Sequence, residues 1–117
     1  MESFGSYVRA RREALNAEDK SMSLRQVALR IGVEPAFLSK IERDVAPPPS
    51  EAKIVALAQA LGEDPDVLLA MAGKVSSELQ AIIRKRPQLI GELLRQLKAQ
   101  PDHAILSIVR QVTDGDW

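Results

Sequence analysis

The chain has 117 residues, enough for one ordinary domain or for one small domain with a short appendage. Apolar residues make up 45% of the chain and aromatic residues only 3%, which predicts an aliphatic core, and 16 basic residues balance 16 acidic ones. The absence of cysteine excludes disulfides and thiolate chemistry, and a single histidine excludes a histidine-rich metal site. With no apolar run near the roughly 18–20 residues of a membrane span and no hydrophobic signal-peptide stretch, we expect a cytoplasmic protein that needs no cofactor or metal and contacts no membrane.

Apolar residues recur at helical spacing along the chain, and no segment shows the alternation of a β-strand, so we predict an all-α fold. The first helix has Phe4, Val8 and Leu15 on its inner face, and the polar segment 16–22 interrupts the pattern. Ser23, with Gln26 three residues later, has the spacing of a capping box and starts the second helix. Gly32 is placed to end it.

A third helix is predicted over residues 35–43, with Glu34 at its N-cap and Pro35 in its first turn. The prolines at 47–49 exclude a helix interior there. Two more helices are predicted to start at Ser50 and at Pro65 and to end at Gly62 and at Gly73.

Residues 74–117 have a different pattern, with three short helices expected to start at Ser76 or Ser77, at Pro87 and at Pro101-Asp102. Each has a wide apolar stripe. We therefore divide the chain into a domain at 1–73 and a C-terminal helical extension at 74–117, and we expect the extension to form a homodimer. The alternative is that the extension folds back and closes its own core, which would leave a monomer or a dimer through the fifth helix. The residues expected at this dimer contact are Leu89, Ile90, Leu93, Leu94, Leu97, Ile105, Ile108 and Val109.

The helices around Gly32 are joined by too few residues to pack antiparallel, so they must cross steeply, as in a helix-turn-helix. Apolar spacing predicts that Val27, Ile31, Leu38 and Ile41 are buried between them. The outer side of the second helix of the pair then carries Glu34, Pro35, Ala36, Phe37, Ser39, Lys40 and Arg43.

The segment LRQVALRIGVEPAFLSKIERDVAPPPS resembles the helix-turn-helix core of the Xre-type, phage-repressor-like transcription regulators. The segment FGSYVRARREAL is similar to the first helix of that family, and IVALAQALGEDPDVLL is similar to its fourth and fifth helices. The resemblance spans about residues 4–72. It implies a five-helix DNA-binding domain, not an enzyme, whose recognition helix at about 35–43 enters the major groove.

Four residues are candidates for base contacts: Ala36, Phe37, Ser39 and Lys40. Lysine can donate to guanine, and the alternative for Lys40 is a phosphate contact or a solvated side chain. An apolar side chain at 36 or 37 can contact a thymine methyl group, although Phe37 is also a candidate packing residue. The candidates for backbone contacts are Ser23, Arg25, Arg30 and Arg43, and at least one of the arginines is expected on a merely solvated face.

The same resemblance implies a buried structural ion pair between Arg12 and Glu42, the alternative being two exposed charges. The acidic group at 63–66 is better explained by helix capping than by a cation site. His103 is expected at the surface. No serine has a neighbouring base, so nucleophilic catalysis is unsupported.

Two functions follow from these patterns. The first is a sequence-specific transcriptional regulator, a repressor by default, that binds double-stranded DNA at a near-palindromic operator as a homodimer. The second is an antitoxin or protein-interaction module whose C-terminal helices bind a partner protein, either a toxin or a co-regulator. Steep salt dependence of binding to random duplex would favour the first function, and a co-purifying small protein would favour the second.

Overall fold

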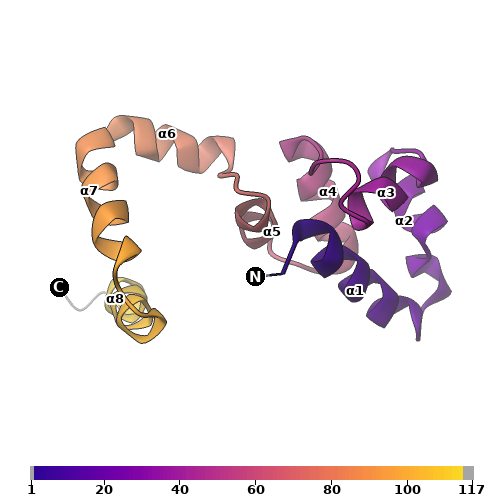
Figure 1. Ribbon diagram of the computed structural model, residues 1–117, viewed down its shortest axis with the longest axis horizontal. Coiled ribbons are helices and arrows are strands. Elements are labelled where there is room, and N and C mark those ends of the chain that lie inside the picture. The colour runs from indigo at the N-terminus through magenta and orange to yellow at the C-terminus, as the bar shows by residue number, and fades with distance from the viewer. Residues whose placement is uncertain (1, 115–117) are drawn as a thin grey trace. The chain divides into compact units, whose positions relative to one another are not determined.

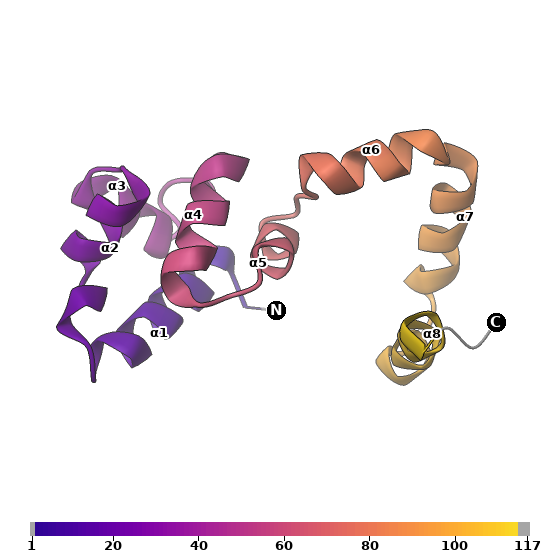
Figure 2. The same ribbon diagram turned by 180° about the vertical axis from the view of Figure 1, so that it is seen from behind.

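The computed structural model describes residues 2–114, and all the regular structure in that range is helical, which confirms the predicted all-α fold. The chain divides into two compact units, Met1–Ser76 and Ser77–Trp117, called here the N-terminal and C-terminal units (Figures 1 and 2). This division falls just after the boundary expected at Gly73. The helices of the N-terminal unit are α1 (Phe4–Asn16), η1 (Lys20–Met22), α2 (Leu24–Ile31), α3 (Pro35–Glu42), α4 (Glu51–Leu61) and α5 (Pro65–Met71).

The predicted helix starts and stops are found where local chemistry requires them. The Ser23 hydroxyl accepts a hydrogen bond from the Gln26 amide at 3.2 Å and so caps α2. Gly32 ends that helix in the left-handed conformation, at φ 74°. Ser50 caps α4 in the same way as Ser23 caps α2, and Gly62 ends α4 at φ 68°. These residues satisfy backbone groups that a helix end otherwise leaves unpaired.

The third helix is one residue shorter than predicted. It ends at Glu42, and Arg43 is its C-cap with φ −93° and ψ 4°. Asp44 follows with φ 59°, in the left-handed region that few residues other than glycine adopt. The chain therefore leaves the helix at Arg43.

The segment 16–22 is more ordered than a polar interruption. The Asp19 carboxylate accepts hydrogen bonds from the backbone amide and the hydroxyl of Ser21, at 3.0 and 2.6 Å, and caps the short helix η1. This helix delivers Met22 into the core, where it is 5% exposed. Hydrophobic periodicity missed the contact because a single buried residue has no period.

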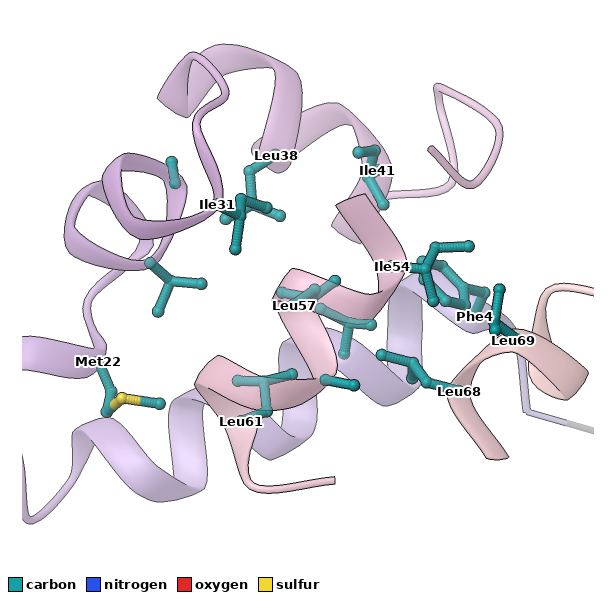
Figure 3. Close-up of a cluster of buried hydrophobic side chains, with 14 residues drawn as sticks. Phe4, Met22, Ile31, Leu38, Ile41, Ile54, Leu57, Leu61, Leu68 and Leu69 are labelled. Carbon is teal, nitrogen blue, oxygen red and sulfur yellow. The ribbon is translucent and has the colours of Figure 1, made fainter. Parts of the chain in front are cut away.

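One hydrophobic core, aliphatic apart from Phe4 and Met22, holds the N-terminal unit together (Figure 3). Its side chains come from α1 to α5 and from η1. The residues predicted to be buried in α2 and α3 all belong to it, and α2 packs against both α3 and α4. The fully or nearly fully buried members include Val8, Val27, Leu38, Ile41, Ile54, Leu57, Leu61, Leu68 and Leu69.

The C-terminal unit consists of α6 (Ser77–Lys85), α7 (Pro87–Lys98) and α8 (Asp102–Asp114), with starts at the expected positions. Helices α6 and α7 pack against each other. No side chain between residues 77 and 113 is buried. Leu89 and Leu94 on α7 keep 69% and 60% of their surface exposed. Within the described residues, the apolar stripes of this unit therefore do not close into a core of their own.

Candidate nucleic-acid interface

The turn between α2 and α3 is fixed by backbone and side-chain hydrogen bonds. The amide of Val33 donates to the carbonyl of Ala28 at 3.0 Å. From α4, the Lys53 ammonium donates to the carbonyls of Ile31 and Gly32 at 2.9 and 3.3 Å. A cation at the carboxyl end of α2 also interacts favourably with the dipole of that helix. These bonds hold the end of α2 and the first residues of the turn in place.

The role of Lys53 cannot be predicted from the sequence. Its partners lie about twenty residues away in the chain, on a different helix, and neither partner is an acidic side chain. No sequence pattern identifies a lysine whose partners are backbone carbonyls of another helix. Only its position in the first turn of α4, which packs on α2, brings it to this turn.

Helix α3 has a buried side and an exposed side. Leu38 and Ile41 point into the core, and Glu42 is buried as well. Ala36 and Lys40 are exposed and four residues apart, so they share one face of the helix. Phe37 is 39% exposed, at the edge of that face, while Ser39 is half-buried at the opposite edge. The four predicted base-contact residues therefore lie on the solvent side of α3.

A buried ion pair joins this helix to α1, as the resemblance implied. Arg12 Nε lies 2.7 Å from Glu42 Oε2, and Arg12 Nη2 donates to Glu42 Oε1 at 3.0 Å. The two side chains are only 8% and 4% exposed. The hydrogen bond to Glu42 raises the pKa of Arg12 above its ordinary value, although burial opposes the shift. This two-point contact fixes both the distance and the rotation of α3 relative to α1.

A second link between the same helices was not foreseen. Asp44 accepts hydrogen bonds from the Ser3 hydroxyl at 2.7 Å and from the Gly5 amide at 3.2 Å. Gly5 lies so close to α3 that a Cβ atom there would overlap the backbone oxygen of Ile41. The residue at 44 therefore ties the end of α3 to the start of α1, and glycine at 5 permits the close approach.

Of the predicted backbone-contact residues, Ser23, Arg25 and Arg43 lie at or beside the exposed side of the helix pair. Arg43 Nε donates to the Ser39 hydroxyl at 3.3 Å. Both residues line a shallow polar pocket between α1 and α3, to which Leu24 at the start of α2 also contributes. Arg25 is exposed, and within residues 2–114 neither Arg25 nor Arg43 nor Lys40 forms an ion pair.

Arg30 is placed differently. Its guanidinium donates to the backbone oxygen of Ser21, and a second nitrogen lies 3.4 Å from the Met22 sulfur. It lines a hollow with Leu15 and Gln59, away from the pocket that contains Arg43. The structure thus gives Arg30 a partner in the segment between α1 and α2.

An apolar surface adjoins the start of α3. Leu29 on α2 is 73% exposed, and together with Val33 and Pro35 it lines a groove that also contains Arg25, Gln26 and Glu34. Glu34 is the N-cap residue of α3, yet its side chain makes no capping hydrogen bond. The entry to α3 is therefore apolar, with one carboxylate.

The part of the chain that the structure describes contains neither a metal-binding cluster nor a membrane-spanning helix. No three histidine, aspartate or glutamate side chains gather in a way that would hold a metal ion. None of the helices there has the length and apolar character needed to cross a membrane. His103 is exposed.

Comparison with known protein families agrees with the helix-turn-helix arrangement of α2 and α3. A family model described as a helix-turn-helix domain matches residues 3–71, from the cap of α1 to the last residue of α5. No curated protein and no solved structure matches the chain significantly.

Proposed function

Because the chain belongs to the helix-turn-helix domain family, we propose that it is a sequence-specific DNA-binding regulator of transcription of the Xre type, acting in the cytoplasm on double-stranded DNA. In this proposal α3 enters the major groove and the start of α2 lies against the phosphate backbone. The observation that carries it is the exposed face of α3, which the Arg12–Glu42 pair holds against α1. This face contains Lys40 and is followed by Arg43, and neither forms an ion pair with any residue from 2 to 114.

The proposed base contacts come from α3, namely Ala36, Phe37, Ser39 and Lys40. The proposed backbone contacts come from Ser23, Arg25 and Arg43, which surround that helix. Phosphate contacts of this kind position a protein on the duplex, and base contacts specify the sequence. Arg30 stays outside the proposed interface, because it would have to leave the Ser21 carbonyl and the Met22 sulfur to reach a phosphate.

We further propose that the regulator acts as a homodimer on a near-palindromic operator. One short helix in one groove makes too few contacts for specific affinities of about 10⁻⁸ M or tighter. Two copies related by a two-fold axis place two recognition helices about one helical turn of DNA apart. A dimer bound at a promoter would block polymerase access, so we propose repression.

The C-terminal unit is the proposed dimer contact. Its α7 face contains Leu89, Leu93 and Leu94, all exposed, and between residues 77 and 113 no side chain is buried. Large contiguous apolar patches are rare on monomeric proteins. A second copy with the same patch is the simplest partner, since a two-fold axis matches the patch with itself. Residues Ile90, Leu97, Ile105, Ile108 and Val109 complete the proposed contact. A toxin or a co-regulator on this face is the competing occupant.

The salt dependence of duplex binding tests the function. Each phosphate that a cation neutralises contributes a slope of about −0.9 to the logarithm of affinity against the logarithm of salt concentration. For binding of the full chain to random duplex, we expect a steep negative slope, equivalent to several phosphates. Absence of binding at low salt, or a flat dependence, would contradict the proposal.

A further inference from the structure

The first turn of α3 has an unusual surface for a helix placed against base edges. Its exposed side chains at positions 36 and 37 are Ala36 and Phe37, and neither carries a hydrogen-bond donor or acceptor. Phe37 keeps 39% of its surface exposed although an aliphatic core lies under the same helix. The carboxylate of Glu34, immediately before the helix, can only accept hydrogen bonds when ionised. This turn therefore cannot donate a side-chain hydrogen bond to a base or to a phosphate.

Apolar side chains can still read sequence in one way. The major-groove edge of thymine carries a 5-methyl group, which cytosine, adenine and guanine lack. Contact with that methyl group removes apolar surface of both partners from water. Phosphate oxygens offer no such gain to an alanine or a phenylalanine.

We propose that Ala36 and Phe37 recognise thymine through its 5-methyl group, so that the half-site of this protein requires a thymine opposite the first turn of α3. The inference rests on the proposed function, because it presumes that α3 lies in the major groove. It specifies how a base is recognised: the first turn of α3 contacts a methyl group, and the second turn makes the hydrogen bonds to bases.

Lys40 limits where a second specific base lies. It follows Ala36 by four residues, about 6 Å along the helix axis at about 1.5 Å per residue. Stacked base pairs are about 3.4 Å apart. The two backbone positions are thus separated by no more than about two base-pair steps, and the flexible lysine side chain extends the range by a few more. A guanine that accepts from Lys40 therefore lies within a few base pairs of the thymine that contacts Ala36. The preferred half-site therefore contains a thymine and a guanine at a short separation along the DNA.

The test uses the full chain and DNA in which thymine is replaced by deoxyuridine. Uracil keeps every hydrogen-bonding group of thymine and lacks only the methyl group. Duplexes of about 20 base pairs would be selected from a random library by the protein. The enriched duplex would then be resynthesised with deoxyuridine at one thymine at a time. We expect affinity to fall about fourfold, the value of one buried methyl group, at one or two positions in each half-site.

Variants assign the effect to residues. In Phe37→Ala and Ala36→Gly, the ratio of affinities for thymine and uracil duplexes should fall towards one. Val67→Ala truncates another exposed apolar side chain, on α5, and should keep the full ratio. Thermal melting verifies that each variant is folded. The comparison of thymine and uracil duplexes with the unsubstituted protein does not depend on the folding of any variant.

The outcomes separate the inference from the function on which it rests. If the selected duplex binds tightly and every uracil substitution leaves its affinity unchanged, methyl readout is wrong while DNA binding stands. If no duplex is enriched and none binds at low salt, the proposed function itself is wrong.

Discussion

Arg12 and Glu42 form a buried two-point ion pair, at 2.7 and 3.0 Å, that connects the middle of α1 to the last residue of α3. Removing one partner strands a buried charge, so we expect Arg12→Ala to destabilise the fold by about 3–5 kcal/mol. Arg9 is the matched control, because it pairs with Glu13 on the same helix at 3.0 Å but is half exposed. Arg9→Ala should cost about 0–1 kcal/mol.

Chemical denaturation of both variants measures the difference. Similar small losses of unfolding free energy for Arg12→Ala and Arg9→Ala would show that the buried pair does not hold α3 in place. Because the pair sets the orientation of α3, Arg12→Ala should also weaken DNA binding at temperatures where the variant is still folded.

Lys40→Glu tests the placement of the recognition helix. Lys40 is exposed on the proposed groove side of α3 and forms no ion pair with any residue from 2 to 114, so the fold should tolerate the change. Loss of a base contact, with added repulsion from phosphates, should lower specific affinity at least about tenfold. The control Lys20→Glu changes the net charge equally, on η1. A folded Lys40→Glu protein with unchanged affinity would place the interface elsewhere.

Gly5→Ala tests the close approach of α1 to the end of α3. An added Cβ at this position would overlap the Ile41 backbone oxygen, so one of the two helices must move. We expect a loss of about 1–3 kcal/mol, typical of overpacking. A Cβ atom at Gly91 in α7 would make only an ordinary van der Waals contact, with an Arg95 side-chain nitrogen at 3.7 Å. Gly91→Ala should leave the melting temperature unchanged or raise it, because alanine favours the helix. Equal changes in stability for Gly5→Ala and Gly91→Ala would show that the close approach of α1 and α3 does not require glycine at position 5.

Leu94→Glu tests the proposed dimer. The change puts a charge into the exposed apolar face of α7, and a two-fold axis places it in the interface twice. We expect sedimentation to show a monomer whose affinity for an operator is strongly reduced. Gln88→Glu adds the same charge at another exposed position of α7 and should leave the dimer intact.

The fragment 1–73 addresses the same question without a substitution. It should remain helical, sediment as a monomer and lose most operator affinity. A fragment that stays dimeric with full affinity would move the interface into the N-terminal unit. A full-length protein that is monomeric and co-purifies with a small protein would support the competing occupant of the C-terminal unit.

Much of the N-terminal unit follows from local sequence. Ser23 and Gly32 define the limits of α2 through hydrogen bonds and backbone conformations that involve only near neighbours in the chain. The apolar spacing of α2 and α3 placed Val27, Leu38 and Ile41 in the core, where the structure has them. Signals of this kind are readable because cause and effect lie within about one helical turn.

The remaining features depend on contacts between distant residues. Asp44 adopts a left-handed conformation and binds the start of α1, and nothing in the residues around it predicts that partner. Arg30 appeared equivalent to Arg25 as a phosphate ligand, yet it bonds to Ser21 and Met22. A flexible cationic side chain has the same signature in the sequence whether it contacts protein or solvent. The base contacts and the dimer stay predictions, because each depends on a partner molecule that the sequence of one chain does not contain.

The central claim, that α3 enters the major groove, is tested most directly by methylation protection of the selected duplex with dimethyl sulfate. Guanine N7 faces the major groove and adenine N3 faces the minor groove, so the reagent reports on both. We predict that the full chain protects guanine N7 in each half-site, and that Lys40→Glu loses this protection. Protection confined to adenine N3, or no protection at saturating protein, would contradict the account.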